Sequence, residues 1–254
     1  MSEADSRREA IAVAVAERGR VSVANLSQTL HVSDMTVRRD LEVLEDQGLV
    51  RRVRGGAVAR TSNAYEPPYL KRRSQHTDAK QRIAEAAAEL ILDGDTVVLD
   101  TGTTSLALAR VIRGRKMITV VTAALRVATE LANEPDIRVV VAGGFIRPNE
   151  LSLVGALAES AFREFNCDTA FIGAGGVHPV KGVTEFNADD ARVKRLALAA
   201  STRHVVLADA SKLGRVAFAN VASIDEIGLL ITDAPTDHPA VSALIEAGVS
   251  VTNV

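Results

Sequence analysis

The sequence has one cysteine, no tryptophan and few aromatic residues, which make up 3% of its 254 positions. The single cysteine, Cys167, excludes an internal disulfide and favours a reducing compartment. We interpret it as a small buried hydrophobe at the start of a strand rather than as a reactive thiol. Because hydrophobic residues still make up 47% of the chain, a sizeable core is expected, filled by Ala, Val, Leu and Ile.

Long apolar runs and an excess of positive charge are also missing. No run reaches the roughly 18 apolar residues of a membrane span, and the polar start MSEADSRREA is unlike a signal peptide. The formal net charge of -2 confines any nucleic-acid contact to a local patch. The histidines show no metal-ligand spacing, and no catalytic triad or Walker motif stands out. We therefore expect a cytoplasmic protein with no membrane contact, no metal or cofactor and no catalytic residues.

Three segments of different character divide the chain. Residues 1–60 show short amphipathic helices followed by a glycine-tipped hairpin, the pattern of a winged helix-turn-helix domain. Residues 61–78 lose this periodicity and contain Pro67-Pro68, which predicts a partly extended linker. In residues 79–254, apolar β-branched runs alternate with helical segments, as in parallel strands that are buried on both faces. The predicted fold is an α/β main domain with a parallel sheet and a small N-terminal winged helix-turn-helix domain.

The segment SDMTVRRDLEVLED, residues 33–46, predicts the helix that would contact DNA. At about 100° per residue, Val37, Leu41 and Leu44 share one side and must face the core. Met35 and Arg39 then point away from the core. Because a helix in the major groove reads bases with its N-terminal residues, we expect Arg39 to contact a guanine. An apolar contact of Met35 or Thr36 with a thymine methyl is expected beside it.

The hairpin that follows carries arginines on both arms and glycines at its tip, which suits contacts with phosphates or the minor groove. An alternative is a solvated face on which Arg38 and Arg39 pair with Glu42 and Glu45. The coincidence of a capped helix, a preceding helix and turn, and a basic hairpin favours DNA binding. The predicted DNA-binding residues are Ser33, Met35, Thr36, Arg38, Arg39, Arg52, Arg54 and Gly55.

Polar and glycine-rich segments follow the predicted strands at their carboxyl ends, where open parallel sheets bind ligands. DTGTTS, residues 100–105, precedes a predicted helix whose N–H groups and hydroxyls would surround an anion. Lys212 can supply charge to a phosphate, and Asp100 and Asp209 can accept hydrogen bonds from sugar hydroxyls. A phosphorylated sugar is therefore the expected ligand. The predicted ligand-binding residues are Asp100, Gly102, Thr103, Thr104, Ser105, Thr122, Gly143, Gly144, Gly173, Asp209 and Lys212.

The stretch ERGRVSVANLSQTLHVSDMTVRRDLEVLEDQGLVRRVRGGAV resembles the N-terminal signature of the DeoR family of bacterial transcriptional regulators. The resemblance continues through DTGTTS, VVT, AGG, LVG, DTAFIGAGGV and LADASKLG. It implies a C-terminal domain similar to ribose-5-phosphate isomerase that senses phosphorylated sugars, with Gly102, Thr103, Thr104 and Lys212 as effector positions. Ala123 stands where the family often has asparagine, so the choice of effector is expected to differ.

The function expected from residues and resemblance together is a repressor of a carbohydrate-metabolism operon, released from operator DNA by a phosphorylated sugar. Because operators are dyadic, a homo-oligomer, either a dimer or a tetramer, is expected. The alternative is a sugar-phosphate isomerase with an appended DNA-binding module. Such an enzyme needs a carboxylate base near the substrate carbonyl, and Glu185 and Asp189 remain open for that role. We favour a sensor, because the loop after TAFIGAGGV lacks the acidic cluster of the isomerases.

Overall fold

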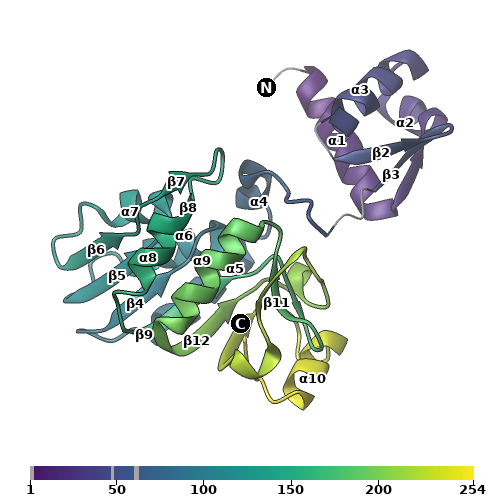
Figure 1. Cartoon of the computed structure of the whole chain (residues 1–254). Coiled ribbons are helices and arrows are strands. Elements are labelled where there is room, and N and C mark those ends of the chain that lie inside the picture. Colours follow the sequence, from purple (N-terminus) through teal and green to yellow (C-terminus); the bar gives the residue numbers. More distant parts are fainter. Residues whose placement is uncertain (1–2, 47–48, 60–62) are drawn as a thin grey trace. The chain divides into compact units, whose positions relative to one another are not determined.

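A computed structural model describes residues 3–46, 49–59 and 63–254 of the chain. The chain divides into two compact units, Met1–Pro67 and Pro68–Val254 (Figure 1). In the part of the chain described, no helix is both long enough and apolar enough to cross a bilayer.

The N-terminal unit combines helices with a small antiparallel sheet in the strand order β1-β3-β2. Its elements are α1 Glu3–Arg18, β1 Arg20–Ser22, α2 Val23–Leu30, α3 Asp34–Asp46, β2 Val50–Val53 and β3 Gly56–Ala59. Their apolar faces meet in one core, which contains Ile11, Val15, Val21, Val23, Leu26, Val37, Leu41, Leu44, Val50 and Ala57. The predicted winged helix-turn-helix is confirmed.

Strand β1 is an addition that sequence periodicity does not predict, because only its central residue is buried. It pairs with β3, and Ser22 lies opposite Gly56. A Cβ atom on Gly56 would lie 1.9 Å from the carbonyl oxygen of Val21. Only glycine therefore allows β1 to lie this close to β3.

The C-terminal unit is built on a seven-stranded sheet with the order β15-β14-β12-β9-β4-β5-β6. Every neighbouring pair of strands in it is parallel, which confirms the predicted α/β domain. The strands are β4 Thr96–Leu99, β5 Ile118–Thr122, β6 Ile137–Val141, β9 Cys167–Gly173, β12 Ser201–Leu207, β14 Leu229–Thr232 and β15 Ser250–Asn253. The sequence did not predict β15. This edge strand has half-buried or exposed residues and therefore contains no apolar run.

Helices cover both faces of this sheet, as the alternation of its side chains requires. Val97 and Leu99 share a core with α5 Thr77–Ala88, α6 Thr103–Val111 and α7 Leu125–Leu131. On the other face, Val98 packs in a core with α8 Ala156–Phe162, α9 Ala188–Ala199 and α10 Pro239–Glu246. Smaller elements complete the unit: β7 Phe145–Ile146, β8 Leu153–Val154, β10 Gly176–His178, β11 Gly182–Glu185, β13 Ala219–Ala222 and the short 3₁₀ helices η1 Ala210–Lys212 and η2 Ile224–Glu226.

The predicted linker over residues 61–78 has more regular structure than its sequence indicates. Residues 60–62 lie outside the described part of the chain, but Tyr69–Ser74 form the helix α4, and α5 begins at Thr77. Pro68 precedes α4, a position that the fixed φ of proline suits. Tyr69 is only 2% exposed, so α4 is held by burial against the C-terminal unit. A helix of 6 residues, less than two turns, is too short to leave a periodic signal.

Candidate nucleic-acid interface and ligand site

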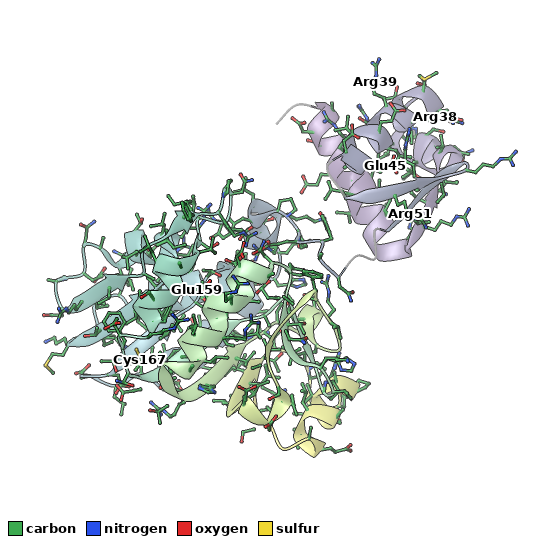
Figure 2. The ribbon with its side chains drawn as sticks, viewed as in Figure 1. Arg38, Arg39, Glu45, Arg51, Glu159 and Cys167 are labelled. Carbon is green, nitrogen blue, oxygen red and sulfur yellow. The ribbon has the colours of Figure 1, made fainter. Side chains whose placement is uncertain are left out.

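Helix α3 exposes the side that the sequence assigns to DNA. Val37, Leu41 and Leu44 are each at most 1% exposed, as predicted, whereas Met35 is 74% exposed. Arg39 lies on the same exposed side (Figure 2). The helix therefore presents one long apolar and one cationic side chain to an incoming partner.

The start of α3 is fixed by two of the predicted residues. The hydroxyl of Ser33 accepts a hydrogen bond from the backbone N–H of Thr36 at 3.2 Å, the geometry of an N-cap. The two hydroxyls also lie 2.9 Å apart. Both side chains are thus engaged with each other while they remain at the helix end that would enter a groove.

A buried carboxylate on the opposite side of α3 was not recognised from the sequence. Asp40 is 5% exposed, and its oxygens lie 2.6 Å from Nε of Arg7 and 3.6 Å from Nε of Arg8. This ion pair ties α1 to α3. Asp40 follows Val37 by three residues and precedes Leu44 by four, so helical spacing places it at the edge of the core face.

Glu42 and Glu45 of α3 pair with the hairpin rather than with the arginines of the helix. Arg52 lies 2.6 Å from Glu42 and 2.8 Å from Glu45, and its backbone N–H donates to Glu45. Among the described residues, Arg38 and Arg39 form no ion pair. The alternative of a self-paired helix face is therefore wrong, and Arg52, which we expected at phosphates, is occupied in holding the hairpin against α3.

The turn of the hairpin carries the remaining predicted residues. Arg54 and Gly55 join β2 to β3, and both are exposed. Gly55 has a φ of +80°, a conformation that glycine adopts without a steric penalty. Arg51, which the sequence did not single out, is also exposed (Figure 2). The hairpin thus offers cations at its tip and along one arm.

In the C-terminal unit, a buried ionic cluster forms where β4 and β9 end. Nζ of Lys194, in α9, lies 2.8 Å from Asp100 and 2.6 Å from Glu185. It also donates to the carbonyl of Gly173 at 2.9 Å, while the N–H of Gly173 donates to Asp100 at 2.8 Å. Lys194, Asp100 and Glu185 are 3%, 7% and 7% exposed. The cluster therefore ties the ends of two central strands to α9 and β11.

Charge in this cluster is set by burial and by the ion pairs together. Burial raises the pKa of Asp100, and Lys194 only partly opposes it. Burial also acts to raise the pKa of Glu185, but the charge and hydrogen bond of Lys194 hold that pKa below its ordinary value. For Lys194, burial acts to lower the pKa, and the two carboxylates outweigh it, so the lysine stays charged at neutral pH. Both carboxylates are engaged by this one cation.

A second lysine lies at the end of β12. Asp209 caps the short helix η1, where its carboxylate accepts a hydrogen bond from the N–H of Ser211 at 3.0 Å. Lys212 ends η1, and its Nζ lies 5.7 Å from the centre of the Phe186 ring. Burial lowers the pKa of Lys212 to about 8, although Asp209 opposes the shift. A bound anion would relieve this desolvated cation.

The DTGTTS loop has the conformation of an open helix N-terminus. Gly102 precedes α6 with φ +108° and ψ -179°, a backbone conformation reserved for glycine. No side chain caps the helix, so the N–H groups of its first turn, beginning at Thr103 and Thr104, are available to an acceptor. Since β4 and β12 are separated by β9 alone, Asp100, this loop and Lys212 share one region of the sheet edge.

Other predicted residues are buried or lie farther along the edge of the sheet. Thr122 is 0% exposed, and its hydroxyl donates to the carbonyl of Leu99 at 2.6 Å. The side chain of Ser105 is also 0% exposed. Gly143 and Gly144 follow β6, which lies four strands from β12, or about 19 Å at the usual strand spacing. The strands whose ends were predicted to converge, β12, β9, β4, β5 and β6, are consecutive in the sheet, and Gly143 and Gly144 lie at the opposite end of this series from Lys212.

Sequence reasoning missed Lys194, Arg72 and Lys80. Lys80 is 6% exposed, and its Nζ donates to the carbonyl of Arg72. Burial lowers the pKa of Lys80; the charge of Asp209 opposes this shift and that of Arg72 adds to it, and Arg72 also acts to lower the pKa of Lys212, which burial lowers most. Arg72 therefore lies in the same electrostatic environment as the predicted ligand site, and it is paired with Glu150. These residues lie within helices and carry no local motif, so only their packing identifies them.

Comparison with known proteins gives a family match for each of the two units. Residues 7–63 match the DeoR-like helix-turn-helix domain, and residues 75–234 match the DeoR C terminal sensor domain. The HTH-type transcriptional regulator GlpR of Haloferax volcanii is 39% identical over 251 residues, covering 99% of this chain and 98% of that protein. The glycerol-3-phosphate regulon repressor of Escherichia coli is 35% identical over 239 residues, covering 94% and 93%.

Among solved structures, ribose 5-phosphate isomerase A of Methanocaldococcus jannaschii superposes with a TM-score of 0.42 at 19% identity, over 54% of this chain and 55% of that one. This likeness is too distant to inform on function. The two domain matches and the full-length relatives agree with the exposed face of α3 and with the separate α/β unit. The chain belongs to the DeoR family of transcriptional regulators, with an N-terminal helix-turn-helix domain that binds DNA and a C-terminal sensor domain.

Proposed function

We propose that this regulator represses a carbohydrate-metabolism operon and leaves its operator when a phosphorylated sugar binds the C-terminal unit. The name of the Escherichia coli relative, a regulon repressor, supports the sign of regulation and a phosphorylated polyol among the candidate effectors. One observation carries the proposal: an uncapped helix N-terminus and a desolvated lysine lie in the same region of the sheet edge as the carboxylate of Asp100. Phosphate and hydroxyl groups are the ligand chemistry that this set suits.

The proposed division of labour in the sensor follows from the site. Thr103, Thr104 and the first N–H groups of α6 hold the phosphate, and Lys212 neutralises part of its charge. Asp100 and Asp209 orient hydroxyls of the sugar. Lys194 does not contact the ligand. Its ion pair with Asp100 holds that carboxylate in position.

On the DNA side, we propose that Arg39 reads a base and that Met35 makes an apolar contact with a neighbouring methyl group. Arg54 contacts the phosphate backbone, and Arg51 joins it on the exposed arm of the hairpin. Arg52 acts indirectly, since its ion pairs with Glu42 and Glu45 hold the hairpin against α3.

We propose a sensor without catalytic activity. Glu185, one of the two residues that the sequence left open as a base, is buried and paired with Lys194, and Asp189 is exposed at the start of α9. A buried carboxylate that is held by an ammonium group is poorly suited to removing a proton from a substrate. The protein is further proposed to act in the cytoplasm, without metal or cofactor, as a dimer or tetramer on a dyadic operator.

The experiment has two steps. Selection from a random DNA pool with the full-length protein yields the operator, and phosphorylated sugars, glycerol 3-phosphate included, are then titrated into the labelled complex. We expect one class of sugar phosphate to release the DNA, and recovery of that sugar unchanged. Release by none of them would refute the proposed effector, and conversion of the sugar would favour the isomerase alternative.

Variants in the site make the test specific. Thr103→Ala and Lys212→Ala should each weaken effector binding about ten- to a hundred-fold, the cost of losing a hydrogen bond to a charged group. Operator affinity without sugar should barely change, because both residues lie in the C-terminal unit. If neither variant shifts the midpoint of release, the phosphate does not bind at this loop.

A further inference from the structure

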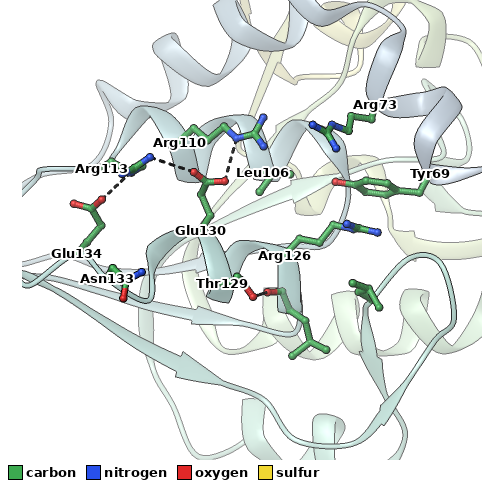
Figure 3. A pocket seen from close by; sticks show the side chains of 12 residues that line it. Tyr69, Arg73, Leu106, Arg110, Arg113, Arg126, Thr129, Glu130, Asn133 and Glu134 are labelled. Atoms are coloured by element: carbon green, nitrogen blue, oxygen red, sulfur yellow. Dashed lines mark hydrogen bonds and ion pairs between the residues drawn. The ribbon is translucent and has the colours of Figure 1, made fainter.

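A second pocket lies between α4, α6 and α7 (Figure 3). It has a volume of about 480 Å³ and is lined by Tyr69 and Arg73 of α4, by Leu106 and Arg110 of α6, and by Arg126 of α7. None of the residues that line it is among those predicted to bind the sugar phosphate. Its size falls within the range of small-molecule sites.

The charges around this pocket do not balance. Its lining contains four arginines and two glutamates. Arg113 lies 2.7 Å from Glu134, and Arg110 lies 3.1 Å from Glu130, so both glutamates are already engaged (Figure 3). Arg73 and Arg126 have no carboxylate partner within the described residues. Two guanidinium groups thus remain uncompensated by any carboxylate in the lining.

A buried hydroxyl points into the same space. Tyr69 is 2% exposed, and within the described chain its hydroxyl has no hydrogen-bond partner. Figure 3 shows this hydroxyl directed into the pocket, between Arg73 and Arg126. Nε of Arg126 is also buried without a partner, and its guanidinium carbon lies 3.9 Å from the centre of the Tyr69 ring. Buried polar groups in native proteins are normally satisfied, so these two call for an external acceptor.

We propose that this pocket binds a small anionic metabolite through a phosphate or carboxylate group, held by Arg73, Arg126 and the hydroxyl of Tyr69. An oxyanion accepts hydrogen bonds from all three donors at once and neutralises the excess positive charge. The apolar side chain of Leu106 would contact the remainder of the molecule. Because Tyr69 and Arg73 belong to α4, the ligand would fasten the first helix of the C-terminal unit to α6 and α7.

The chain offers a direct reporter for this site, since it contains two tyrosines, Tyr65 and Tyr69. Full-length protein labelled with 3-fluorotyrosine should give one ¹⁹F resonance for each, assigned with the Tyr65→Phe variant. We expect inorganic phosphate or citrate, titrated at constant ionic strength, to shift the Tyr69 resonance saturably and to leave that of Tyr65 in place. A response to phosphate alone or to citrate alone identifies the preferred group.

Matched variants separate the site from other effects. Arg73→Gln should weaken the response about tenfold or more, as expected for the loss of a charged hydrogen bond. Arg163→Gln, which changes an exposed arginine outside the pocket, should not change it. The Lys212→Ala variant should also respond like the wild type. A loss of sugar-phosphate binding at the proposed effector site can therefore be distinguished from a loss of anion binding at this pocket.

Two results would overturn the proposal. The first is a Tyr69 resonance that neither anion shifts, or that shifts equally in wild type and Arg73→Gln. The second is a shift that follows protein concentration in the absence of added anion, which would indicate that a carboxylate from a second copy fills the pocket. Saturable binding that requires Arg73 and is independent of protein concentration would establish the small-anion site.

Discussion

The lowered pKa of Lys212 makes effector binding dependent on pH in a range where few other groups titrate. With a pKa of about 8, Lys212 is mostly charged at neutral pH and mostly neutral one unit above 8. A phosphate group favours the charged form of Lys212, so we expect only protein molecules with protonated Lys212 to bind the effector tightly. Because Lys212 in the complex is protonated more readily than in the free protein, effector affinity is highest below pH 8 and falls as the pH rises.

The magnitude follows from the titration curve. Between about pH 7 and pH 9 the protonated fraction falls from roughly nine tenths to one tenth, so the dissociation constant should rise about tenfold. The phosphate group itself has a second pKa near 6, so it is ionised throughout this range. The charges that act on Lys212 come from several elements: Asp209 and Glu185 raise its pKa, whereas Arg215 and Arg72 lower it.

Calorimetric titration of the effector at a series of pH values measures this dependence, with Lys212→Arg as the matched variant. Arginine stays protonated over the whole range, so its affinity should be flat where that of the wild type falls. Lys80 also has a pKa that burial lowers, and it is unchanged in the variant. An affinity of the wild type that stays constant from pH 7 to pH 9, or one that falls equally in Lys212→Arg, would refute the role of Lys212.

Further predictions concern the DNA interface, the buried cluster and the boundary of the sensor. Arg39→Ala should cost about 1–3 kcal/mol on the operator and flatten the preference at one base in a binding-site selection, whereas Arg54→Ala should weaken operator and random DNA alike and reduce the salt dependence. Lys194→Met should lower the free energy of unfolding by about 3–5 kcal/mol in denaturant titrations, because two buried carboxylates lose their cation; an unchanged midpoint would contradict this. A fragment of residues 68–254 should bind the effector like the full chain. Residues 79–254 should bind it more weakly, because they lack α4 and with it Arg72, whose positive charge acts on the same region as Lys212; equal calorimetric affinities would show that α4 is dispensable.

Repeating patterns in the sequence were sufficient for the fold class of both units, although not for β1, β15 or α4. The spacing of Val37, Leu41 and Leu44 determined which side of α3 is buried and so which side, with Met35 and Arg39, is exposed. Continuous β-branched runs likewise indicated parallel strands with two buried faces. Such patterns can be recognised because the buried side of each element is occupied by apolar residues. These recur about every 3.6 residues in a helix and every 2 residues in a strand with one buried face.

The partners of individual charged residues could be learned only from the tertiary structure. Arg52 appeared in the sequence as a phosphate contact, but the fold places it against Glu42 and Glu45. Lys194 lies in an unremarkable helix, yet it joins Asp100 to Glu185 at the end of the sheet. An ion pair between distant positions leaves no local periodicity, so neither partner predicts the other.

The extent of the ligand site was likewise decided by the order of the strands. A sequence shows which strands end in polar residues, but it does not give the order of the strands in the sheet. That order brings Asp100, Gly173 and Asp209 together and leaves Gly143 at a distance. It is determined by the packing of the helices on both faces, which involves the whole C-terminal unit at once, and no single segment of the sequence encodes it.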